Sequence, residues 1–152
     1  MEIEFKPIMP KKPIVNAQAV YRGLAQEMYR FVTELRKKIA KYPPDQPTVS
    51  GYRRTTALGR SWSPSVERKP ALIIGRVTSD PTVMTRTPHQ RRLKSGGLSK
   101  PWFPKKSYAP YVVGKRQSRL MAGRGWKKVG DILKKEWPGQ VRRFQGVINR
   151  TK

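Results

Sequence analysis

The chain has 152 residues, enough for one domain and too few for two comfortable ones. Only 36% of its residues are hydrophobic, fourteen are proline and none is cysteine, which predicts a small core and excludes disulfides and thiolate metal sites. Its 34 lysines and arginines face nine acidic residues, for a net charge of +25, and a longest apolar run of about five residues excludes a membrane-spanning helix.

So large a charge repels itself and weakens the compact state unless a polyanion neutralises it. DNA and RNA are therefore the expected partners. The alternative is a protein that is basic without any nucleic-acid role.

Residues 1–15 are predicted to form an extended N-terminal arm, because three prolines interrupt any helix there. Apolar residues, among them Phe5 and Ile8, recur between the polar ones. This pattern favours an arm that packs on a neighbouring subunit over a disordered tail, and makes these two side chains candidate interface residues.

A long amphipathic helix is predicted to follow, beginning after Asn16, which is a good N-cap. Spacings of three and four give it one apolar stripe, made of Ala17, Val20, Leu24, Met28, Phe31, Leu35 and Ile39. Lysines in the last turn suit the helix dipole, and the prolines after Tyr42 end the helix. The stripe indicates a core or subunit contact.

Residues 51–62 are expected to form one or two helical turns around Leu58. Residues 65–79 are predicted to form one or two strands, with Ile73, Ile74 and Val77 in the core.

From Asp80 to Ser107 the sequence shows no clear period, and four prolines rule out a central strand. Between Thr85 and Ser107 it has seven basic residues and no acid. We expect this basic insertion to be mobile in the free chain and ordered in an assembly, because it cannot bury enough apolar surface by itself.

Residues 108–113 are predicted to form a further strand. Another helical stripe starts at Trp126 and ends at Trp137. Pro138 is expected to break or kink this helix, and a second short helix is expected to start at Gly139. The expected fold class is α+β: two main helices, N-terminal and C-terminal, packed on a small antiparallel sheet. Residues 16–152 would form this single domain, with the basic insertion at about 80–107.

Two stretches, "RRTTALGRSW" and "SYAPYVVGKRQSRLMAGRGW", resemble motifs of the tail-completion, or neck, proteins of long-tailed bacteriophages. The matching residues are Thr56, Ala57, Leu58, Arg60 and Ser61 in the first stretch and Tyr108, Ala109, Tyr111, Val112 and Trp126 in the second. The chain departs from that family at Ala57, where glycine is usual, and in its basic insertion. It also has Gly114, Lys115 and Arg116 where the family often has an acidic group.

The resemblance implies a structural virion protein without enzymatic activity. It would be one subunit of a ring of six or twelve copies that joins tail to head and surrounds or approaches the DNA channel. Its partners would be other copies of itself, neighbouring neck, portal-side and tail proteins, and the DNA backbone without sequence specificity. No membrane partner and no cofactor is implied. The protein would be assembled in the bacterial host cytoplasm and reside in the virion.

Candidate residues for contact with nucleic acid are Arg86, Arg91, Arg92, Lys94, Lys105, Lys106, Lys115, Arg116 and Arg119. Candidates for subunit contact are Phe5, Ile8, Trp102, Phe103, Tyr108, Tyr111 and Trp126. For Tyr108, Tyr111 and Trp126, an ordinary place in the core is an alternative that is compatible with a nearby interface.

No catalytic or metal site is expected, because His89 is the only histidine and the nine acids are scattered. The alternative function is a ribosomal protein that binds rRNA through its basic extensions. A small nucleic-acid-binding regulator is a weaker alternative, since the sequence has no helix-turn-helix, zinc or RNP signature.

Overall fold

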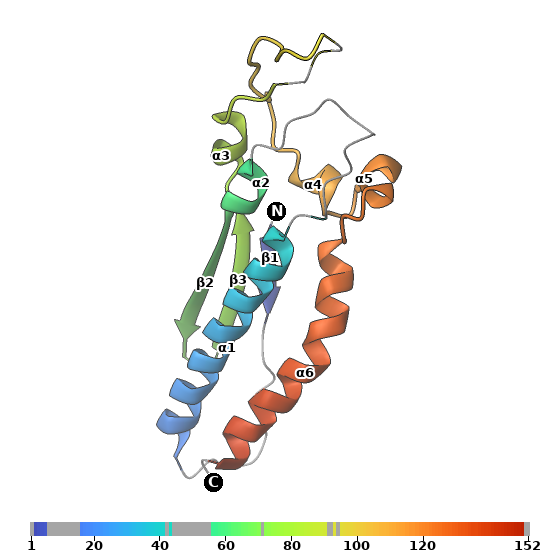
Figure 1. Ribbon diagram of the computed structural model, residues 1–152. Coiled ribbons are helices and arrows are strands. Elements are labelled where there is room, and N and C mark those ends of the chain that lie inside the picture. The colour runs from blue at the N-terminus through green and yellow to red at the C-terminus, as the bar shows by residue number, and fades with distance from the viewer. Residues whose placement is uncertain are drawn as a thin grey trace.

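The computed structural model describes residues 2–5, 16–41, 43, 56–70, 72–90, 93 and 95–150 (Figure 1). In chain order its elements are β1 (Glu2–Phe5), α1 (Ala17–Ala40), α2 (Ala57–Arg60), β2 (Trp62–Lys69), β3 (Leu72–Ser79), α3 (Pro81–Thr85), α4 (Ala109–Val112), α5 (Arg119–Gly123) and α6 (Val129–Arg150). The long helices α1 and α6 lie side by side and antiparallel, and α1 packs on the sheet. The expected α+β class, with two main helices on a small antiparallel sheet, is confirmed.

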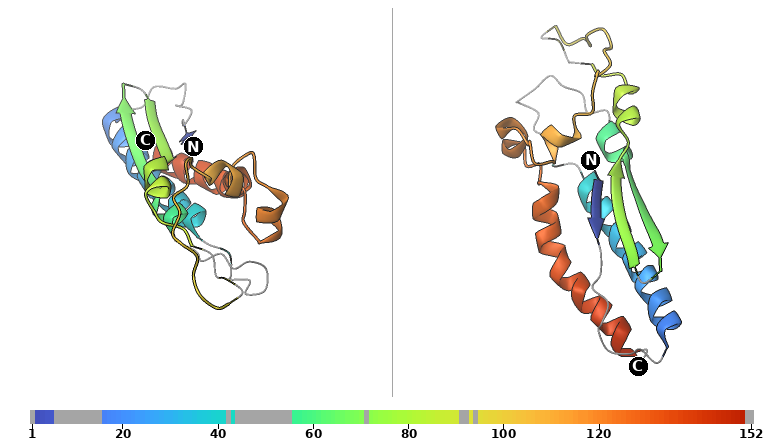
Figure 2. Two further views of the ribbon diagram at one scale, coloured as in Figure 1. Left: turned by 90° about the horizontal axis from the view of Figure 1, so that it is seen from above. Right: turned by 180° about the vertical axis from the view of Figure 1, so that it is seen from behind.

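The molecule is elongated, and its two ends differ (Figures 1 and 2). The two long helices and the sheet form a body, while α3, α4, α5 and the loops between them gather at one end. We call the described residues of 81–128 the distal end. Arg150, the last described residue of α6, lies at the opposite end of the molecule.

Helix α1 forms where the sequence predicted it. The side chain of Asn16 caps it by accepting a hydrogen bond from the Ala19 amide at 3.1 Å. Its buried residues are Val20, Leu24, Ala25, Met28, Phe31, Val32, Leu35 and Ile39, so the predicted stripe is the core face apart from the exposed Ala17. Hydrophobic burial of this face holds α1 against the sheet.

The sheet has the strand order β1-β3-β2, and both pairs are antiparallel. The hairpin of β2 and β3 pairs Trp62 with Ser79 at one end and Lys69 with Leu72 at the other. Ile73, Ile74 and Val77 are buried, as predicted.

Gly75, in the middle strand, lets α1 come close to the sheet. A Cβ on Gly75 would lie 2.5 Å from Met28 Sδ and 2.7 Å from Val32 Cγ1. A side chain at this position would therefore push α1 off the sheet.

The predicted N-terminal arm starts with a strand of the domain's own sheet. Glu2 pairs with Thr78 and Phe5 with Gly75, so these four residues extend the sheet beyond β3. The view from behind in Figure 2 shows β1 between β3 and α6. The rest of the predicted arm, including Ile8, lies outside the described residues.

The strand predicted for residues 108–113 is wrong, because this segment forms helix α4. The Tyr108 carbonyl accepts a hydrogen bond from the Val112 amide at 3.2 Å, which closes a helical turn. Pro110 fits the first turn of a helix, where its missing N–H is not needed.

Of the break or kink expected at Pro138, the break is wrong, because α6 is continuous through this residue and no second helix starts at Gly139. Packing against α1 accounts for the continuity. The Trp137 ring lies 5.8 Å from that of Phe31 and 6.3 Å from that of Phe144. Trp126 precedes α6 and does not belong to its apolar stripe.

Ion pairs join the two long helices and neutralise acids of the body. Glu27, 12% exposed, lies 3.7 Å from Arg30 and 3.8 Å from Arg143. Lys38 of α1 pairs with Glu136 of α6 at 2.6 Å, and this pairing lowers the pKa of Glu136. On the sheet, Glu67 pairs with Arg76 and Lys69.

Candidate nucleic-acid interface

Positive charge is segregated along the chain. Residues 81–130 hold thirteen lysines and arginines and no acid, so all nine acidic residues lie outside this stretch. Its described cations at the distal end are Arg86, Lys100, Lys105, Lys106, Lys115, Arg116, Arg119, Arg124, Lys127 and Lys128, and all except the half-buried Arg124 are exposed. This end therefore presents cations to solvent from a stretch without acids, whereas some cations of the body, such as Lys38 and Arg76, pair with acids.

Gln117 holds three of the predicted contact residues in place. Its side-chain Nε2 donates to the Val112 carbonyl at 2.7 Å and to the Trp126 carbonyl at 2.9 Å, closing a loop over residues 112–126. The Val129 amide also donates to the Val113 carbonyl at 2.8 Å, which ties this loop to α6. We call residues 113–126 the basic knob, because Lys115, Arg116 and Arg119 are exposed on it.

Gly114 is required where the knob turns back over α4. A Cβ on Gly114 would lie 2.7 Å from the Cα and 2.8 Å from the carbonyl oxygen of Pro110. Because these are backbone atoms, they could not move aside as the end of a side chain would. The turn that positions Lys115 and Arg116 thus depends on this glycine.

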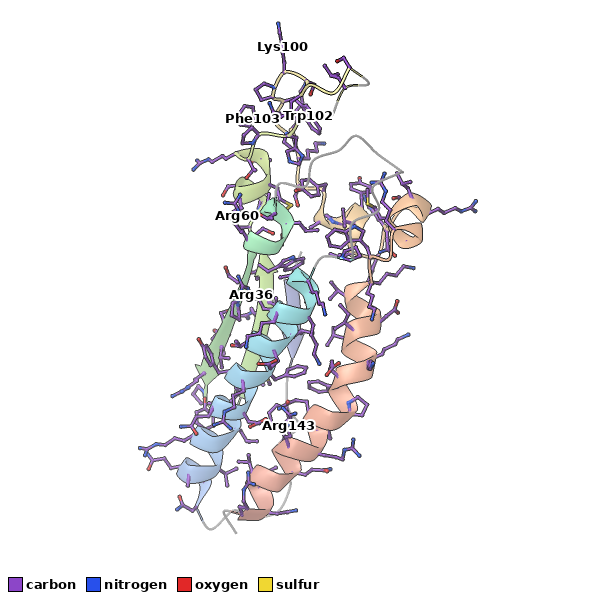
Figure 3. All side chains as sticks on the ribbon, viewed as in Figure 1. Arg36, Arg60, Lys100, Trp102, Phe103 and Arg143 are labelled. Carbon is purple, nitrogen blue, oxygen red and sulfur yellow. The ribbon has the colours of Figure 1, made fainter. Side chains whose placement is uncertain are left out.

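The basic insertion contains a hydrogen-bonded hairpin that the sequence did not predict. His89 and Trp102 exchange two backbone hydrogen bonds, of 2.8 and 2.9 Å. At the tip, the Leu93 amide donates to the Gly97 carbonyl at 2.8 Å, and Gly96 turns the chain with a φ of +87°. We call the described residues of 89–102 the finger, and Figures 1 and 3 show them projecting beyond α2 and α3.

An aromatic cluster forms the base of the finger. The His89 side chain is buried, and its ring lies 4.9 Å from that of Trp102 at a 34° tilt and 5.5 Å, edge-on, from that of Tyr108. Burial lowers the pKa of His89, so this imidazole is neutral at pH 7. The single histidine is thus a packing residue.

We expect acid to loosen the finger. Because the folded state lowers the pKa of His89, the unfolded chain binds more protons, and this part of the stability is lost as the pH falls below about 6.5. Thermal melts between pH 7.5 and pH 5 should show a falling midpoint for the native chain. The midpoint of His89→Phe should fall less, since no other histidine exists. Parallel pH profiles for the two chains would contradict this prediction.

The other predicted contact residues fall into three groups. Trp102, Phe103 and Tyr111 are 41%, 56% and 52% exposed, so each presents aromatic surface at the distal end. Tyr108 and Trp126 are half-buried against the core, as the alternative for them allowed. Arg91, Arg92, Lys94 and Ile8 lie outside the described residues, and Phe5 is in β1.

Several residues at or near the distal end were not predicted from the sequence as contact residues. Lys100, Arg124, Lys127 and Lys128 belong to the same acid-free stretch, which was the available signal for them. Arg60 lies on α2, which contacts the distal helix α3 (Figure 3). Nothing in the sequence marks Gln117, because its role depends on two carbonyls that the fold brings together.

A metal-binding cluster and a membrane-spanning helix are both absent from the part of the chain that the structure describes. Within it, no three His, Cys, Asp or Glu residues group together so as to hold a metal ion. None of the described helices is long and apolar enough to cross a membrane. Comparison of the chain with protein-family models, curated proteins and solved structures found no match.

Proposed function

We propose that this chain is a structural, non-enzymatic ring subunit of a phage neck or tail top, and that its distal end binds the DNA backbone. The observation that carries the proposal is the gathering of exposed cations at one end of an elongated body, in a stretch of sequence that holds no acid. In a ring, the distal ends of all subunits would face the central DNA channel.

The shape of the distal end favours contacts with phosphates over contacts with bases. Its helices α3, α4 and α5 have only five, four and five residues, too few for a recognition helix in the major groove. Lysine and arginine on loops neutralise phosphates and carry no sequence information. Binding without sequence preference follows from this arrangement.

Two features support placement in a protein ring. The two stretches that carry the resemblance, residues 53–62 and 107–126, both follow α1 and precede α6 in the chain. Exposed apolar side chains, among them Tyr111 and Leu120, also lie beside the cations at the distal end. Exposed apolar surface of this kind is typical of contacts with neighbouring proteins.

The DNA-binding part of the proposal predicts strongly salt-dependent binding. In filter-binding titrations, two unrelated duplexes of equal length should bind with the same affinity. The logarithm of the binding constant should fall with the logarithm of salt concentration by roughly 0.9 for each phosphate contacted. A slope near zero, or a strong preference for one duplex, would refute backbone binding.

Placement in the particle is tested separately. Antibody labelling of intact virions should mark the junction between head and tail, and an electron-microscopy map should show this fold in a closed ring. Absence of the chain from purified particles would refute the virion role, whatever its affinity for DNA.

A further inference from the structure

Trp102 is held in a fixed position at the base of the finger, yet it remains accessible. Its backbone exchanges two hydrogen bonds with His89, and its indole ring packs against the buried imidazole at 4.9 Å. Even so, 41% of the residue is exposed, so the contact with His89 leaves aromatic surface open to solvent. Figure 3 shows Trp102 next to Phe103, well away from the helices of the body.

The surroundings of Trp102 suit a nucleic-acid strand. Lys100 precedes it and Lys105 and Lys106 follow it, and all three are exposed. Pro101 and Pro104 restrict the backbone on either side, which lowers the entropy lost when a ligand binds. A rigid aromatic face among mobile cations is the arrangement by which proteins hold single strands: bases stack on the ring and phosphates meet the cations.

We propose that Trp102 is a stacking platform for an unpaired nucleobase, so that the distal end prefers single-stranded over duplex nucleic acid. This inference rests on the proposed binding of nucleic-acid backbone and adds to it the class of strand that is preferred. In a duplex the bases are already stacked on one another, and only an unpaired base gains by stacking on the indole. The buried, neutral His89 keeps the indole in place from its other side.

The test compares a short oligothymidylate with a blunt duplex of the same length, both fluorescently labelled, for binding to the full chain. Trp102→Leu keeps apolar bulk against His89 and removes the aromatic face. It should lower affinity for oligothymidylate by roughly fivefold to a hundredfold, and affinity for the duplex by less than about twofold. Trp102→Phe should keep most of the single-strand affinity.

Two further measurements separate stacking from a structural role. For oligothymidylate, the logarithm of the binding constant should fall with the logarithm of salt concentration by roughly 0.7 for each phosphate contacted. This slope should be the same in the native chain and in Trp102→Leu, because the cations are unchanged. Tyr29→Ala removes an aromatic residue of the body that is 56% exposed, and this matched control should leave both affinities unchanged.

The outcomes distinguish the inference from the proposed function. If the native chain binds the duplex with the expected salt dependence but Trp102→Leu binds oligothymidylate as well as the native chain does, only the inference is overturned. Trp102 would then be left as a contact for a neighbouring protein. Equal losses for both ligands would also overturn it, because they would indicate that the distal end had been disturbed. If the native chain binds neither ligand, both proposals fail.

Discussion

Reversing the charges of Lys115, Arg116 and Arg119 to glutamate is expected to lower the affinity for duplex DNA by on the order of a thousandfold at about 50 mM salt. Gln117 holds all three residues on the basic knob. If each contacts one phosphate, losing three contacts should also reduce the salt slope by about 2.7. Filter-binding titrations at several salt concentrations measure both quantities.

The matched control is the reversal of Lys134, Arg142 and Arg150, which are exposed on α6 in the body. This variant has the same net charge as the knob variant, so any difference between them reports position. We expect the control to lose far less affinity, and its salt slope to stay close to that of the native chain. Equal losses in the two variants would mean that only net charge matters, and would contradict a binding surface at the distal end.

Gly75→Val is expected to destabilise the fold by about 3 kcal/mol or more, near the upper end of the cost of overpacking a core. Valine suits a strand, so the loss would come from its collision with Met28 and Val32. For a chain of this length, a loss of 3 kcal/mol corresponds to a fall in melting temperature of about 6–12 °C. Thermal denaturation followed by circular dichroism would measure it.

A double-mutant cycle tests the cause. Met28→Ala alone should be destabilising, but in the Gly75→Val background it should cost less, because it opens space for the valine. Gly146→Ala in α6 is the matched control, since nothing lies within 4 Å of the Cβ it would add. It should stabilise the helix by about 0.5–1 kcal/mol. Strict additivity in the cycle would exclude the proposed collision.

Local signals predicted the body of the fold well. The cap at Asn16 and the apolar spacing that follows it were enough for α1, because a long helix with one buried face has a strong period. One or two strands were also predicted over residues 65–79, which include β3 and most of β2, but their pairing as a hairpin was not predicted. Helix α4 was not predicted. Tyr108, Val112 and Val113 favour a strand by propensity, but the segment has no partner strand among the described residues and closes one helical turn instead.

The positive charge of the candidate site was predicted from the sequence, but its architecture was not. The acid-free stretch is visible in the sequence, and it includes all the exposed cations described at the distal end. The hairpin of the finger is not visible in the sequence, because it depends on the pairing of His89 with Trp102 across residues that have no strand period. Pro138 was misjudged for a related reason: packing of Trp137 between Phe31 and Phe144 outweighs one lost helical hydrogen bond.

The segregation of charge along the chain also has a kinetic consequence. Residues 81–130 carry thirteen cations and no acid, whereas the rest of the chain carries 21 cations and nine acids. Positive charge is therefore denser toward the distal end, which gives the molecule an electric dipole in addition to its net charge. A polyanion would turn the approaching molecule so that the distal end leads, before any contact forms. Such steering can raise association rates by about 10- to 1,000-fold at low salt. Each subunit would thus arrive in the orientation that a closed ring around DNA requires.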